Sequence, residues 1–242
     1  ASKSRSRYNV RVPNRAYLKI WCREVTAETF PKLLLAFLET VPFSLTRRGF
    51  TQLALRAIET SETPLMEFDL RAAPATPEGV LELLGESLRE DSSVELEAWW
   101  DLWVFDAASG EWTSAPQRLE LIAYGPEFED GAWRQTGHFS VDLGFEHMFT
   151  GHAGLLGSPE TPGAADSAAP EDPDEADFVR RMSQPDALRE YAERTRENIR
   201  RLQAWVQQIA QALPLDPGTG IELGSEGEED FEARLDAIET GS

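Results

Sequence analysis

The sequence predicts an α+β fold: a ferredoxin-like split βαβ sandwich (βαββαβ) that is extended by an extra β-hairpin and followed by a long C-terminal amphipathic helix. Alternating apolar segments between residues 16 and 143, interleaved with two segments of helical periodicity, predict the sandwich. A faint internal repeat suggests two related halves, because residues 26–38 align without gaps on residues 76–88 and share a Thr, a Glu and three leucines. An apolar stripe at 3–4 residue spacing over residues 186–213 predicts the long helix.

The first half of the predicted sandwich contains one strand, one helix and a pair of strands. Residues 16–22 alternate between polar and apolar side chains, as a strand does. Thr26 is expected to cap a helix whose apolar residues share one face, and Pro42 ends that segment. Residues 50–58 and 65–70 are then expected to form two strands joined by a polar turn.

The second half repeats this order and adds a hairpin. Thr76 is the expected N-cap of a second helix, with Pro77 at its first position. A long strand is predicted over residues 94–106. Two further strands, over residues 118–124 and 138–143, are expected to extend the edge of the sheet.

Changes in composition divide the chain into five predicted parts. Pro, Ala and acidic residues, with little to bury, indicate a disordered linker between the sheet domain and the long helix. The parts are a basic N-terminal arm (1–15), the α+β sandwich domain (16–157), the linker (158–177), a helical segment (178–213, main helix 186–213) and an acidic flexible tail with a short helical motif (214–242).

The net charge of −20 is unevenly distributed along the 242 residues. Residues 1–23 carry seven basic side chains and no acidic one, so the other 219 residues hold 16 basic and 43 acidic side chains. A body this acidic repels phosphate backbones, and general nucleic-acid binding is therefore not expected.

Composition also disfavours membrane and secreted classes. No run of about 18 apolar residues occurs, so no membrane span is expected. The basic N-terminus has no apolar region behind it and does not resemble a secretory signal. Cys22 is the only cysteine, which excludes an internal disulfide and fits a cytoplasmic location. Arginine far outnumbers lysine, which suggests a bacterial protein.

All three histidines lie within fifteen residues, which raises the question of a metal or catalytic site. In the strand 138–143, alternation places His138 and Asp142 on the face opposite to the apolar residues. His147 and His152 are five residues apart, which on a helix separates them by about 140°. The leading expectation is no cofactor, and a zinc or iron site built from His138, Asp142, His147 and His152 remains an alternative.

The predicted strands have one apolar register that packs on helices and an opposite register that combines charges with large aromatic side chains. Bare aromatic rings are unfavourable in water, so the long helix, a second copy of the chain, or a foreign partner or ligand is expected to cover this face. Trp, Tyr and Arg are frequent interface anchors. The residues expected to contact a partner or a second copy are Trp21, Arg56, Trp99, Asp101, Trp103, Tyr191, Leu202, Trp205, Phe231, Leu235 and Ile238.

These observations predict a non-enzymatic interaction or assembly protein that uses the sheet face and the C-terminal helix for self-association or partner docking. No convergent catalytic set stands out, and the Gly-x-Ser-x-Gly nucleophile motif is absent. Two alternatives stay open. One is a metal-dependent enzyme with a site near His138, His147 and His152; the other is an acidic inhibitor or immunity-type protein that captures a basic partner.

Overall fold

The computed structural model describes residues 14–152, 155–156 and 173–241. Residues 1–13 of the predicted basic arm and residues 158–172 of the predicted linker lie outside these residues, whereas Arg15 already belongs to a strand and residues 173–177 begin a helix. The described part is a seven-stranded antiparallel sheet with several helices, so the α+β class is confirmed. Within it, no helix combines the length and the apolar character needed to span a bilayer.

The elements overlap the predicted ones, except that the strand predicted over residues 118–124 begins already at Glu111; further elements occur between residues 128 and 182 and in the tail. The strands are β1 (Arg15–Ile20), β2 (Gln52–Ala57), β3 (Met66–Asp69), β4 (Ser92–Asp106), β5 (Glu111–Tyr124), β6 (Phe139–Phe145) and β7 (Ile221–Ser225). The helices are α1 (Phe30–Leu38), α2 (Pro77–Leu84), α3 (Trp133–Thr136), α4 (His147–Thr150), α5 (Pro173–Met182), α6 (Pro185–Ala212) and α7 (Phe231–Thr240), with the 3₁₀ turns η1 (Gly85–Ser87) and η2 (Phe128–Asp130).

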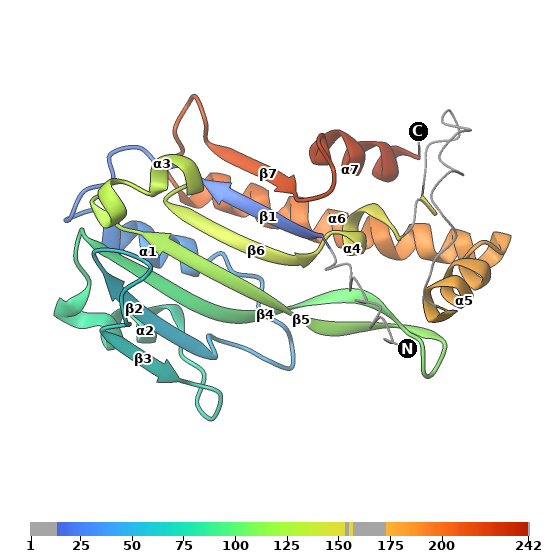
Figure 1. Cartoon of the computed structure of the whole chain (residues 1–242), viewed down its shortest axis with the longest axis horizontal. Coiled ribbons are helices and arrows are strands. Elements are labelled where there is room, and N and C mark those ends of the chain that lie inside the picture. Colours follow the sequence, from blue (N-terminus) through green and yellow to red (C-terminus); the bar gives the residue numbers. More distant parts are fainter. Residues whose placement is uncertain (1–13, 153–154, 157–172, 242) are drawn as a thin grey trace, which may run out of the picture.

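The strand order is β3-β2-β4-β5-β6-β1-β7, and neighbouring strands pair antiparallel throughout (Figure 1). A split βαβ unit instead pairs strands in parallel across a helical crossover. The predicted ferredoxin-like topology is therefore not confirmed. Strand β1 lies between β6 and the tail strand β7, far from the β2–β3 pair that follows it in sequence.

Helices α1 and α2 each begin at a threonine-containing turn whose hydrogen bonds fix the first residue of the helix. Thr76 caps α2 as predicted, because its hydroxyl oxygen accepts a hydrogen bond of 3.1 Å from the backbone N–H of Gly79. Helix α1 begins at Phe30, whose N–H donates to the carbonyl oxygen of Thr26 at 2.8 Å. Its N-cap is Thr29, so the turn at Thr26 precedes the helix.

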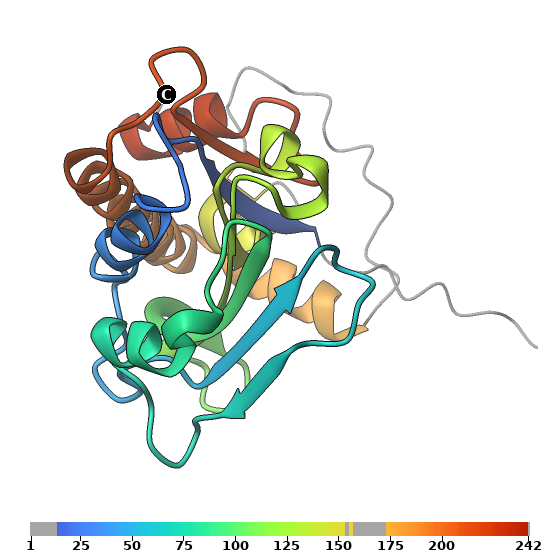
Figure 2. The same cartoon turned by 90° about the vertical axis from the view of Figure 1, so that its left-hand side faces the viewer.

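The hydrophobic core lies between one face of the sheet and helices α1, α2 and α6, which Figure 2 shows on the same side of the sheet. The predicted apolar register is confirmed, with Leu18, Leu96 and Val141 fully or almost fully buried. Trp205 of α6 packs on Trp100 with ring centroids 5.7 Å apart. Helices α6 and α7 therefore belong to the same core as the sheet, and the tail contributes to it.

The hairpin of β4 and β5 extends beyond its neighbours. β2 pairs with β4 only from Ser92 to Glu97, whereas β5 pairs with β4 as far as Asp106. The backbone N–H of Ser44 donates to the Trp99 carbonyl at 2.6 Å, and helix α6 contacts the backbone groups further along β4. The Asn198 side chain accepts from the Trp103 N–H at 2.8 Å and donates to the Trp103 carbonyl at 3.0 Å, and Arg201 donates to the Asp101 carbonyl. Asn198 thus occupies the place of a neighbouring strand.

Replacement of Asn198 by Ala tests whether the contacts of its side chain with the edge of β4 stabilise the fold. The change leaves the N–H and C=O of Trp103 and the carbonyl of Met148, to which Asn198 donates at 3.1 Å, without their partner. We expect a loss of about 2–4 kcal/mol in the free energy of unfolding, measured by urea denaturation. Replacement of the exposed Gln207 on the same helix by Ala is the control, and equal midpoints for the two variants would contradict the role of Asn198.

Candidate functional site

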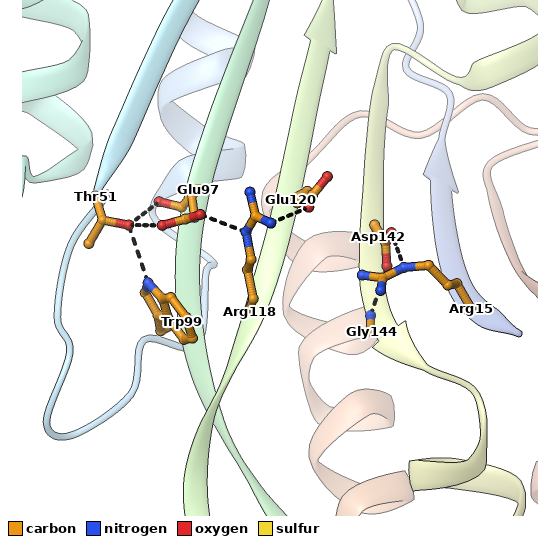
Figure 3. Close-up of polar contacts among 8 residues, drawn as sticks. All are labelled: Arg15, Thr51, Glu97, Trp99, Arg118, Glu120, Asp142 and Gly144. Atoms are coloured by element: carbon orange, nitrogen blue, oxygen red, sulfur yellow. Dashed lines mark hydrogen bonds and ion pairs between the residues drawn. The ribbon is translucent and has the colours of Figure 1, made fainter. Parts of the chain in front are cut away.

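A row of carboxylates crosses the sheet on the face opposite to α1, α2 and α6. Glu97, Glu120 and Asp142 lie directly opposite one another on β4, β5 and β6. We call these three residues the carboxylate row. Adjacent strands are about 4.8 Å apart, so the row spans about 10 Å. Figure 3 shows the three side chains on neighbouring strands together with the arginines that contact them.

Arg118 neutralises two members of the carboxylate row. Its guanidinium lies 2.6 Å from Glu97 and 2.9 Å from Glu120 (Figure 3). The Glu97 side chain is only 11% exposed and also accepts a hydrogen bond of 2.6 Å from the hydroxyl of Thr51. Glu97 is thus a nearly buried carboxylate held by one arginine and one hydroxyl, while Arg118 and Glu120 remain about half exposed.

The third member, Asp142, is paired with Arg15 of β1 and accepts a backbone hydrogen bond from Gly144 at 2.9 Å (Figure 3). The hydrogen bond with Asp142 raises the pKa of Arg15, and the negative charges of Asp142 and Glu120 act in the same direction. Each carboxylate of the row therefore has an arginine from its own chain, and the negative charge that remains is spread along the row.

The tryptophans predicted for this face are each covered by neighbouring residues of the chain. The indole N–H of Trp99 donates to the Thr51 hydroxyl at 3.2 Å, and the guanidinium carbon of Arg47 lies 4.3 Å from the centre of a Trp99 ring. Trp21 is 8% exposed and lies outside the helix-side core. Trp103 is half-buried beneath Arg194 of α6. The expected continuous aromatic surface is thus divided among three separate places.

Other predicted contact residues of this face take part in ion pairs or hydrogen bonds. Arg56 pairs with Glu95 at 2.6 Å, and Asp101 accepts from the backbone N–H of Leu45 at 2.9 Å. The residues predicted on the long helix and the terminal motif are instead buried inside the chain. They are Tyr191, Leu202, Trp205, Phe231, Leu235 and Ile238. Helix α6 covers the apolar face of the sheet and does not cover the carboxylate row.

A second candidate site lies where the β4–β5 hairpin meets α4, α5 and α6, at the right-hand end of the molecule in Figure 1. It is a cleft of about 470 Å³, which we call the aromatic cleft. Two residues of the predicted partner set and two of the predicted metal alternative meet there. Its lining residues are Trp103, Val104, Phe105, Trp112, Gln117, Phe145, His147, Met148, His152, Phe178, Tyr191, Thr195 and Asn198.

Four rings in the lining form a closed circuit. Phe105 contacts Trp112 with ring centroids 5.5 Å apart, Trp112 stacks on Tyr191 at 5.3 Å, Tyr191 meets Phe178 at 5.9 Å, and Phe178 returns to Phe105 at 5.6 Å. These separations lie in the range of attractive aromatic pairs. The circuit joins the hairpin to α5 and α6, so the walls of the cleft are held in place by their own packing.

Two polar groups of the cleft, Tyr191 and His147, are neutral near pH 7. Burial raises the pKa of Tyr191 to about 12, and its hydroxyl accepts a hydrogen bond of 2.6 Å from the backbone N–H of His152. Burial lowers the pKa of His147 to about 4, and the neighbouring His152 lowers it further. The cleft therefore holds an uncharged phenol and an uncharged imidazole at physiological pH.

The residues of the metal alternative are not brought together. His138 lies at the opposite end of β6 from His147, stacks on Trp133 at 4.3 Å and accepts from the Cys22 backbone N–H at 3.1 Å. Asp142 belongs to the carboxylate row. Only His147 and His152 are close, with ring centroids 5.2 Å apart. Among the described residues, no group of three His, Cys, Asp or Glu side chains could hold a metal ion.

Sequence reasoning missed most of the cleft. Trp112 lies between the strands predicted over residues 94–106 and 118–124, and Phe178 follows the predicted linker. Thr195 and Asn198 carried a usable signal, because they fall on the 3–4 spaced stripe of α6 between Tyr191 and Leu202 and are 3% and 2% exposed. Buried polar residues on an apolar stripe need partners, which indicates polar contacts at that point of the helix.

Replacement of Arg118 by Gln tests the charge balance of the row. It leaves the nearly buried Glu97 without its cation and opposite Glu120, so we expect a loss of about 1–2 kcal/mol in the free energy of unfolding. The double variant Arg118→Gln/Glu97→Gln should recover most of this loss in urea denaturation. Arg71→Gln, at an exposed ion pair with Asp69, is the control and should leave the midpoint unchanged. A double variant as unstable as the single one would refute the pairing.

The lowered pKa of His147 predicts a dependence of stability on pH. The unfolded chain binds a proton near pH 6.5, whereas the folded chain binds it near pH 4, so stability falls as the pH is lowered through this interval. From pH 8 to pH 5, His147 should account for a loss of about 2 kcal/mol. The His147→Gln variant should show a correspondingly flatter pH dependence of the urea midpoint. Parallel curves for the two proteins would contradict the prediction.

Comparison of the chain with protein-family models, with curated proteins and with solved structures found no match. No likeness to another protein therefore assigns a role to either site.

Proposed function

We propose that the chain is a non-enzymatic interaction protein that docks a partner bearing basic groups on the sheet face around the carboxylate row. The observation that carries the proposal is the alignment of Glu97, Glu120 and Asp142 on three consecutive strands. The cytoplasmic setting of this interaction is part of the proposal and rests on composition, including the single cysteine.

The alignment is unfavourable for the sheet by itself. Like charges directly opposite one another across strands are destabilising, and the row contains two such pairs in succession. Arg118 and Arg15 reduce the repulsion but stay partly exposed, so they remain accessible to solvent and to an approaching partner. A local rule broken on an open surface is typical of a functional site.

The charge of the whole chain favours a basic partner over a second copy. With a net charge of −20, two copies that stack through this face bring their carboxylate rows together. A basic partner is attracted instead, and the long-range field of an acidic protein speeds the encounter. The spacing of about 5 Å between neighbouring carboxylates suits lysine or arginine side chains of one partner element.

Among the described residues, no helix covers the central part of the face. Helices α1, α2 and α6 lie on the other side of the sheet, and the short helix α3 contacts this side only at one end, where Trp133 stacks on His138 (Figure 2). The described helices therefore do not obstruct docking over β4, β5 and β6, where the paired side chains present a polar surface.

The test uses a defined basic peptide and a charge-matched control. The variant Glu97→Gln/Glu120→Gln/Asp142→Asn should bind a lysine- and arginine-rich octapeptide about tenfold more weakly than the unaltered chain, as measured by calorimetry at low salt. Glu78→Gln/Glu82→Gln/Glu86→Gln, which removes the same charge from α2 and η1, should weaken binding by less than about twofold. Equal losses in the two variants would refute docking on the sheet face.

A further inference from the structure

We propose that the aromatic cleft binds a small planar aromatic compound that carries a hydrogen-bond acceptor oxygen. This inference is independent of the proposed docking on the carboxylate row. The two sites share no lining residue, and they offer different chemistry: paired charges on an open face, and neutral rings around a cleft.

The size of the cleft and its lining set the class of ligand. A volume of about 470 Å³ lies in the range of small-molecule sites, which are mostly apolar with a few polar groups. Six of the lining side chains are Phe, Trp or Tyr, and two more are His. Flat faces of this kind favour a planar ring, which stacks on them or meets their edges.

The walls are preformed. Each ring of the circuit Phe105–Trp112–Tyr191–Phe178 is held by its two neighbours, and His152 extends the chain of contacts from Phe178 at 5.5 Å. A ligand therefore does not have to order these side chains when it binds, which favours affinity in a small site.

One residue of the cleft lining carries a hydrogen-bond donor that has no acceptor among the described residues. The indole N–H of Trp103 is buried and has no hydrogen-bond acceptor among the described residues, although Trp103 lines the cleft. Tyr191, whose pKa burial raises to about 12, keeps a protonated hydroxyl in the same lining. Buried N–H groups are almost always paired, so an oxygen acceptor on the ligand would complete the site.

The charge around the cleft favours an acceptor over a cation. No carboxylate occurs among the described lining residues, in a chain with 43 acidic side chains. Two arginines flank it: the guanidinium carbon of Arg194 lies 3.9 Å from the Trp103 ring and that of Arg181 lies 5.0 Å from the Phe105 ring. Arg194 also pairs with Glu190 and Glu197, but its Nε is buried without a partner among the described residues.

Three indole compounds test the inference on the full chain. Indole-3-carboxylate carries the acceptor, indole carries none, and tryptamine carries a cation on the same ring. Calorimetry and saturation-transfer NMR should show that indole-3-carboxylate binds most tightly and tryptamine most weakly. In the variant Trp103→Phe, which keeps an aromatic ring and removes the N–H, affinity for indole-3-carboxylate should fall about tenfold while affinity for indole changes little.

A second variant tests whether the compounds bind in the aromatic cleft, and it leaves the indole N–H of Trp103 in place. Thr195 is buried in the lining, so Thr195→Met should fill part of the cleft and weaken both indole-3-carboxylate and indole, whereas Thr195→Ser should not. The proposal is overturned if none of the three compounds binds, if tryptamine binds most tightly, or if Trp103→Phe weakens indole-3-carboxylate and indole equally. The carboxylate-row variant Glu97→Gln/Glu120→Gln/Asp142→Asn leaves the lining of the cleft unchanged. It should therefore bind indole-3-carboxylate as tightly as the unaltered chain does.

Discussion

The free backbone edge of the long β4–β5 hairpin is the constraint on which the rest of the structure depends. β2 supports β4 only as far as Glu97, and an unpaired strand edge inside a protein leaves N–H and C=O groups without partners. Ser44 satisfies the Trp99 carbonyl on this edge, helix α6 satisfies Asp101 and Trp103 with Arg201 and Asn198, and the same helix buries Trp205 in the core. The helix thus has to lie across the apolar face of the sheet, which leaves the opposite face without it.

This position of α6 creates both candidate sites. Because the helix packs on the apolar face, the carboxylate row of Glu97, Glu120 and Asp142 lies on the face that α6 leaves uncovered. Because the N-terminal part of α6 continues past the core, Tyr191 reaches Trp112 at the end of the hairpin and encloses the aromatic cleft. The chain thereby separates two kinds of chemistry: carboxylates paired with arginines on the sheet, and neutral rings at the hairpin.

Part of each site was visible in the sequence. Alternation along β4 placed Glu97 and Trp99 in one register, opposite to Leu96 and Trp100, and the structure confirms that division. The alternation could not show that Glu97 lies opposite Glu120, since this depends on strand register. The cleft was harder to predict, because its Phe, Trp and Tyr rings come from five elements between residues 103 and 191 that no local pattern connects.

The sequence by itself determined the α+β class, the places of six strands apart from the first half of β5, and the length and apolar stripe of α6, because periodicity and capping depend on neighbouring residues. Only the tertiary structure decided the strand order, the pairing of β7 with β1, and which face α6 covers. The physical reason is that these choices depend on contacts between residues far apart in the chain: Asn198 meets Trp103, and Trp205 meets Trp100. A pattern of polar and apolar residues predicts which side of an element is buried, but it does not predict which other element packs against that side.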